Sequence, residues 1–230
     1  MNIQFRRKPD KEEAALAYNF IKEHKNLITS FLIAVAAIII FVNIFRSNYE
    51  AKRILAADKL FEINLAFNNG DDRAVISNAP SYIKKFSSFD QAADILLILV
   101  MSYIRENNPD QAISTLERNL NISKNSVFKF SAYSILGGLY MDKWLIEEDP
   151  ALAEKAGNYY IKASKSDSRF DDFRILYKAG NSFAEAGNIE RAKEILKPLY
   201  DNSQTIDPGL RDQIKFLYEN IDLLKELKYN

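Results

Sequence analysis

The chain has 230 residues, of which 31 are basic and 31 acidic, and it contains no cysteine. Because the formal net charge is zero, the composition offers neither a basic surface for nucleic acid nor an acidic one, so a polyanion partner is disfavoured. The lack of cysteine excludes disulfide bonds and suits an exported protein, although it is equally compatible with the cytosol.

Residues 1–25 form a basic tail that is too short to fold alone. Its cations outnumber those that follow the next, apolar segment, which gives a small bias toward a cytoplasmic N-terminus. Anionic lipid head groups are the simplest contact for such a tail. The tail cations are Arg6, Arg7, Lys8, Lys11, Lys22 and Lys25, and those of the other flank are Arg46, Lys52, Arg53 and Lys59.

Residues 26–46 are predicted to form a transmembrane helix. No charged residue occurs between Lys25 and Arg46, and a helix of this length, rising about 1.5 Å per residue, crosses a hydrocarbon core of about 30 Å. One alternative is a buried core helix, but such a helix seldom lacks charge on every face. The other is a cleaved signal peptide, which needs small residues at the end of its apolar run, whereas Ala34 and Ala36 lie in the middle. We therefore expect a retained anchor.

Residues 47–230 are predicted to be helical throughout. The chain has only 7 Gly and 6 Pro, period-two alternation is not sustained, and apolar residues recur at intervals of three and four. Each break between predicted helices combines a stop signal with an N-cap residue for the next helix. The breaks lie at 68–72, 87–88, 107–110, 121–125, 147–150, 164–168, 187–188 and 202–208.

The predicted helices come in pairs, and three pairs resemble the tetratricopeptide repeat. That pattern places an aromatic residue, Leu-Gly, Tyr, Ala, a second aromatic residue and Ala at fixed intervals. The middle copy contains Tyr133, Leu136, Gly137, Tyr140, Ala156, Tyr160 and Ala163; the last contains Leu176, Ala179, Gly180, Phe183, Ala192 and Leu196; the first contains Leu96, Leu99, Val100, Tyr103, Ala112 and Leu116.

Small residues are expected where the two helices of a pair cross closely. Twelve positions separate Gly180 from Ala192 in the last copy, and the same interval separates Val100 from Ala112 in the first. The first copy departs from the pattern, because valine stands at its small position. The middle copy has extra residues, which we assign to a longer turn at 141–153.

Atypical helices are expected at both ends of the array. Residues 47–68 and 71–86 form a first pair with few repeat residues, and 207–228 form one amphipathic capping helix. The predicted fold is all-α: one N-terminal transmembrane helix, then a tetratricopeptide-like solenoid over 47–230 that ends in a capping helix. The apolar stripe of the cap contains Leu210, Ile214, Leu217, Ile221, Leu224 and Leu227.

The whole architecture resembles one family, the tetratricopeptide-like ancillary subunit of the bacterial SecYEG translocon. Residues 12–24 are similar to the short amphipathic helix that these proteins carry before their span, and 66–71 are similar to the segment after it. The resemblance implies a single-pass inner-membrane protein with a cytoplasmic N-terminus and periplasmic repeats. It implies three protein partners: a SecYEG-type translocon, a membrane-anchored periplasmic chaperone of the prolyl-isomerase type, and exported client chains whose folding it assists.

The first helices of the pairs line the concave face of a repeat array, where partners bind. Leu97 and Met101 suit an apolar partner segment, but they stand where carboxylate-clamp domains carry polar residues, so capture of a peptide C-terminus in that manner is not expected. The alternative is that an adjoining helix covers them. The predicted surface residues are Asp94, Leu97, Met101, Ile104 and Arg105; Ser131, Ser134, Gly138, Met141 and Asp142; and Arg174, Tyr177, Asn181 and Glu185.

No catalytic motif occurs in the sequence. The only histidine, His24, lies in the tail, and there is no cysteine, glycine-rich phosphate loop or Gly-x-Ser-x-Gly elbow. Acidic pairs precede helices, where they complement the helix dipole. We therefore expect no enzyme, cofactor, metal, nucleic acid or small-molecule substrate. Two alternatives to the translocon role stay open: a generic membrane-tethered adaptor for envelope assembly or division complexes, and the same fold with its repeats in the cytosol.

Overall fold

The computed structural model describes residues 11–167, 173–202, 204 and 206–229, with side chains except at 11–14, 17 and 224–229. Helices are the only regular secondary-structure elements in these ranges, and no strand occurs there, which confirms the predicted all-α fold. The chain divides into two compact units, Met1–Ile54 and Leu55–Asn230. The bounds predicted for the tail, the transmembrane helix and the solenoid stay a prediction.

The first two helices are α1 (Lys11–Glu23) and α2 (Lys25–Asn68). Helix α1 forms where the amphipathic helix was expected, while Arg6, Arg7 and Lys8 lie outside the described residues. Helix α2 is long and apolar enough to cross a membrane, and none of its most apolar stretch is buried. This exposure argues against the core-helix alternative, since a core helix buries most of its surface.

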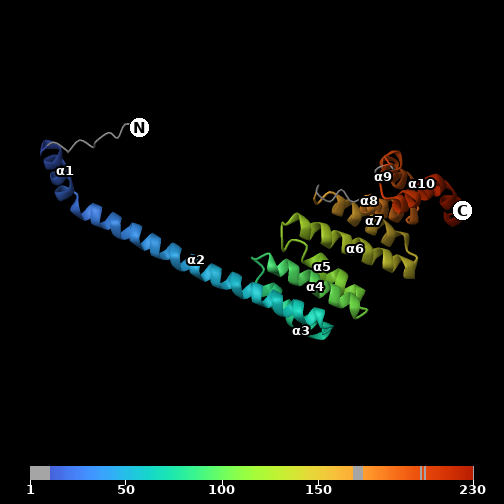
Figure 1. Ribbon diagram of the computed structural model, residues 1–230, viewed down its shortest axis with the longest axis horizontal. Helices are drawn as coiled ribbons and strands as arrows, with labels where there is room; N and C mark the ends of the chain where they lie inside the picture. The colour runs from blue at the N-terminus through green and yellow to red at the C-terminus, as the bar shows by residue number, and fades with distance from the viewer. Residues whose placement is uncertain (1–10, 168–172, 203, 205, 230) are drawn as a thin grey trace. The chain divides into compact units, whose positions relative to one another are not determined.

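Helix α2 also continues through 47–68, the segment predicted as the first helix of the atypical first pair. The remaining helices follow in pairs and a cap, and consecutive helices pack against each other in chain order (Figure 1). The predicted copies of the repeat correspond to α4–α5, α6–α7 and α8–α9. The bounds are α3 Asp72–Lys85, α4 Gln91–Arg105, α5 Pro109–Arg118, α6 Ser126–Glu147, α7 Pro150–Ser164, α8 Phe173–Glu185, α9 Ile189–Asp201 and α10 Pro208–Tyr229.

Local capping contacts explain where these helices begin and end. Gly70 adopts a φ of 76°, a left-handed conformation that glycine allows without strain, and ends the α2 segment. The Asp71 carboxylate then accepts a hydrogen bond from the backbone N–H of Ala74 at 3.0 Å, which caps α3. Asn125 caps α6 in the same way, accepting from the N–H of Val127 at 2.8 Å.

Glycine allows the helices of a pair to approach closely, as the repeat pattern predicts. A Cβ atom at Gly137 on α6 would lie 2.6 Å from the ring of Tyr160 on α7, and one at Gly180 on α8 would lie 2.6 Å from Leu196 on α9. Both distances are far below van der Waals contact. The glycines of the pattern are therefore packing residues, with the large side chain of the second helix lying directly against the backbone of the first.

The prediction of a longer turn in the middle copy was wrong. Helix α6 runs to Glu147 and α7 begins at Pro150, so the extra residues lengthen the helices instead. The physical reason is that neither glycine nor proline occurs between Met141 and Asp149. The helix ends only where Glu148 adopts a left-handed φ of 53°, directly before Asp149, which caps α7. The extension leaves Ile146 82% exposed.

The apolar core runs through the array from α2 to α10. Val100, Ala112, Ala156 and Ala192, which stand at small positions of the pattern, are fully buried. The capping helix behaves as predicted where its side chains are described, because Leu210, Ile214, Leu217 and Ile221 are buried in a cluster with residues of α8 and α9. Leu224 and Leu227 lie outside the described side chains.

Candidate functional site

The residues predicted to bind partners lie on α4, α6 and α8, the first helices of the three pairs; we call their exposed face the first-helix surface. On α4, Met101 is 39% exposed, whereas Leu97 and Ile104 are half-buried and pack against the core. The exposed methionine is a flexible apolar contact. Leu97 and Ile104 contribute both to the surface and to the stability of the array.

A small pocket joins α4 to α6 on this surface and brings three predicted residues together. Asp94, Leu97 and Ser131 line it, along with Asp90 and Val127, and its volume is about 110 Å³. We call it the Asp94 pocket. Partial burial, followed by repulsion from the Asp90 carboxylate, raises the pKa of Asp94. The pocket therefore combines carboxylates with apolar carbon, although sequence periodicity showed only the Asp94, Leu97 and Ser131 part of it.

Arg105 has a structural position at the end of α4. Its guanidinium donates a hydrogen bond to the carbonyl of Phe67 at 2.9 Å, stacks 3.6 Å from the centre of the Phe67 ring, and approaches the buried Asp72 carboxylate to 3.6 Å. These contacts hold α4 to the junction of α2 and α3. Arg105 consequently has much of its bonding capacity satisfied within the chain.

The other predicted residues are spread along α6 and α8. On α6, the Ser134 hydroxyl is buried without a hydrogen-bond partner in the described part of the chain, Gly138 and Met141 are half-buried, and Asp142 is exposed. On α8, Arg174 is exposed while Tyr177, Asn181 and Glu185 are half-buried. Burial raises the pKa of Tyr177. This part of the surface is more polar than the α4 part, as the sequence indicated.

A polar network between the α4–α5 pair and the α6–α7 pair was not predicted. Glu117 on α5 accepts hydrogen bonds from the hydroxyls of Tyr140 at 2.8 Å and Tyr159 at 2.7 Å, and it pairs with Lys155 at 3.1 Å. Burial acts to raise the pKa of Glu117, but the hydrogen bonds from Tyr159, Tyr140 and Lys155 outweigh it, so the pKa is lowered. The Tyr140 and Tyr159 rings also stack, with centroids 5.7 Å apart.

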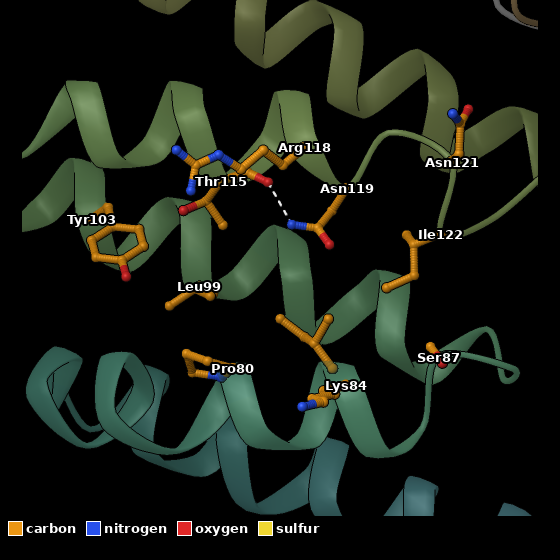
Figure 2. Close-up of a pocket in the computed structure, with 11 residues that line it drawn as sticks. Pro80, Lys84, Ser87, Leu99, Tyr103, Thr115, Arg118, Asn119, Asn121 and Ile122 are labelled. Carbon is orange, nitrogen blue, oxygen red and sulfur yellow. Dashed lines mark hydrogen bonds between the residues drawn. The ribbon is translucent and has the colours of Figure 1, made fainter.

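A larger pocket lies between α3 and α5, the second helices of adjacent pairs (Figure 2). We call it the inter-pair pocket; its volume is about 580 Å³. Leu99 and Tyr103 of α4 contribute to its floor, with Lys84 from α3 and Arg118 from α5 on opposite walls (Figure 2). Sequence reasoning missed it, because its lining comes from separate segments whose individual patterns indicate only helix packing.

Metal binding has no support in the described ranges, where no three His, Cys, Asp or Glu side chains gather closely enough to hold an ion. Both pockets place apolar carbon beside charged groups. The lining of the two pockets contains no histidine or cysteine, and in the Asp94 pocket the Ser123 hydroxyl donates a hydrogen bond to the Asp90 carboxylate at 3.3 Å.

One comparison with known proteins identifies the repeat. Residues 174–202 match the family model of the tetratricopeptide repeat, and this segment contains α8 after its first residue, the whole of α9 and the Gly180–Leu196 contact. The chain matches no curated protein and no solved structure. The chain therefore contains a tetratricopeptide repeat at α8 and α9, within an array of helical pairs, and an N-terminal helix long and apolar enough to span a membrane.

Proposed function

We propose that this protein is a membrane-anchored scaffold whose first-helix surface binds segments of other proteins. Residues 1–25 are the cytoplasmic tail, 26–46 the anchor and 47–230 the tetratricopeptide-like array on the opposite side of the membrane. The observation that carries the proposal is the matched repeat within a stack of helical pairs, since such repeats typically form surfaces for protein contact.

The α4 part of the first-helix surface is the centre of the proposed contact. Met101 and Val127 expose apolar carbon there, at 39% and 41% exposure. The Asp94 pocket adds two carboxylates beside it. A partner segment with an apolar side chain next to a lysine or arginine complements this arrangement, because the apolar group buries surface while the cation offsets the like charges of Asp90 and Asp94.

The partners in this proposal are a SecYEG-type translocon, a membrane-anchored prolyl-isomerase-type chaperone and exported chains. The support is architectural: a short basic tail, one apolar helix and helical pairs that begin within the same α2 helix. In this arrangement the anchor holds the array near the site where exported chains emerge. Binding an apolar segment there shields it from aggregation until the chain folds.

Purification of the tagged full chain in mild detergent, followed by mass spectrometry, tests the proposal. We expect SecY-type channel proteins and periplasmic chaperones to co-purify, and we expect Met101→Asp to reduce the recovery of one or more of them. Glu154→Gln, at an exposed carboxylate of α7, is the control. Enrichment of division or envelope-assembly proteins without channel proteins would replace the translocon role with that of a generic adaptor.

A further inference from the structure

The inter-pair pocket exists because short side chains face each other across it. Pro80 on α3 and Thr115 on α5 line opposite walls, and neither carries an apolar group long enough to fill a volume of about 580 Å³ (Figure 2). Farther along the array, another pocket of about 480 Å³ is lined by residues of α7, among them Lys155, Tyr159 and Lys162. The inter-pair pocket differs from it in that α3, α4 and α5 all contribute to its lining.

The floor of the inter-pair pocket is apolar. Leu99 and Ile83 lie among its lining residues although each is nearly buried, and Tyr103 and Ile122 present half-buried apolar carbon beside them. Water in contact with such a floor is unfavourable, so an apolar side chain that displaces it gains about 25 cal/mol per Å² of surface covered. The size of the pocket falls in the range of about 300–1,000 Å³ that is typical of binding sites.

The rim of the pocket is positively charged. Lys84 stands on the α3 wall and Arg118 on the α5 wall, and no acidic residue lines the pocket. Within the described part of the chain, neither cation forms an ion pair, whereas the half-buried Lys143 and Lys193 do. A third cation, Lys129, donates to the lining residue Asn121 at 3.4 Å. The field at the rim consequently favours negative charge.

We infer that the inter-pair pocket docks an acidic amphipathic helix of a partner protein. Its apolar side chains, at i, i+3, i+4 and i+7, enter the space between α3 and α5, and its flanking carboxylates pair with Lys84 and Arg118. A helix fits because the walls are themselves helices, so the ridges of a third helix can lie in the groove between them. Asn119 supports the wall, since its side-chain amide donates to the carbonyl of Thr115 at 2.8 Å.

This surface is separate from the first-helix surface, because α3 and α5 are second helices of their pairs. Occupation of the inter-pair pocket by one protein and of the Asp94 pocket by another joins two partners on one array. The inference therefore adds a second docking site to the proposed scaffold and does not depend on the first.

Fluorescence anisotropy with the full chain in detergent micelles tests the inference. The probe is a labelled peptide of about 15 residues, with leucines at i, i+3, i+4 and i+7 and glutamates at the flanking positions. Two control peptides replace the glutamates by lysines or scramble the leucine positions. We expect saturable binding of the acidic amphipathic peptide and at least about tenfold weaker binding of both controls.

Two pocket variants and one control variant locate the binding on the protein. The double change Lys84→Glu with Arg118→Glu should weaken binding of the acidic peptide by about tenfold and strengthen binding of the lysine peptide. The control, Lys197→Glu with Lys215→Glu, makes the same charge change at exposed positions outside the pocket and should leave both affinities within about twofold. Thr115→Trp should fill the space and block binding while circular dichroism stays helical.

Equal binding of the acidic and scrambled peptides, or an unchanged affinity in both pocket variants, would overturn the inference. So would a labelled fatty acid that binds in a Thr115-dependent manner while the acidic peptide does not bind, because the site would then belong to lipid. Met101→Asp should not affect this peptide, so a failure here is distinguishable from a failure of the first-helix surface.

Discussion

Tyr160 and Leu196 occupy the space that a side chain would need at Gly137 and Gly180. Two neighbouring glycines of α6 therefore differ in how much room a side chain would have. A Cβ at Gly137 would meet the ring of the buried Tyr160 at 2.6 Å, but one at the neighbouring Gly138 would come no closer than 3.8 Å to the Tyr160 hydroxyl. The two positions form a matched pair, because they share a helix and differ only in what lies opposite.

We predict that Gly137→Ala destabilises the protein by about 1–3 kcal/mol, since the Tyr160 ring cannot move without disturbing the core. Gly138→Ala should instead stabilise by up to about 1 kcal/mol, because alanine favours the helix over glycine. Urea unfolding followed by circular dichroism measures both changes. Equal effects of the two substitutions would contradict the close approach of α6 and α7.

Glu117 provides a prediction of pH dependence. Its pKa is lowered in the folded protein from the ordinary value of 4.5, so its contribution to stability is present above that value and is lost as the pH falls through the folded pKa. Glu117→Gln should reduce the free energy of unfolding by about 1 kcal/mol at neutral pH, because charge-assisted hydrogen bonds from Tyr140 and Tyr159 become neutral ones.

The difference between wild type and Glu117→Gln should disappear in acid, where the wild-type carboxyl is protonated. Urea midpoints at neutral pH and well below the unfolded pKa check this. Glu154→Gln, at an exposed carboxylate of α7 for which no bond is described, is the control and should show no such trend. A constant difference at all pH values would mean that the charge of Glu117 does not stabilise the network.

At the scale of the element, the capping helix shows how one helix separates core from solvent. Ile214 is fully buried against α8 and α9, whereas Phe216, two positions later, is 72% exposed. We predict that Ile214→Ala costs about 2–5 kcal/mol through lost burial and a cavity, while Phe216→Ala changes stability by less than about 0.5 kcal/mol. Thermal unfolding compares the pair. A larger effect at Phe216 would mean that this face of α10 is covered.

Helix boundaries were predictable because their signals are local. Proline, glycine and N-cap residues mark the junctions, and Asp71 and Asn125 cap their helices in the structure as the sequence indicates. The turn predicted at 141–153 is the departure, and its cause is local. The residues after Met141 in α6 include neither glycine nor proline, and a change in repeat length does not by itself end a helix.

At the scale of the whole molecule, the repeat pattern grouped residues that line one pocket but not those that line the other. The three-and-four spacing placed Asp94, Leu97 and Ser131 on the first-helix surface, where the structure joins them in one pocket. Glu117 and Tyr159 are 42 positions apart, and the walls of the inter-pair pocket come from different pairs. Such contacts depend on how pairs stack, which no single-sequence period reports.

The topology of the full chain can be tested without a background signal, because the chain contains no cysteine. Two single substitutions each introduce one exposed thiol: Asn19→Cys on α1, before the apolar stretch of α2, and Gln213→Cys on α10, after it. If α2 crosses the inner membrane with the N-terminus inside, a membrane-impermeant maleimide should label Gln213→Cys in intact spheroplasts and Asn19→Cys only after lysis. The reverse pattern would place the repeats in the cytosol. Labelling of both thiols in intact spheroplasts, or of neither, would mean that the helix does not cross at all, since only a crossing helix puts its two ends in different compartments.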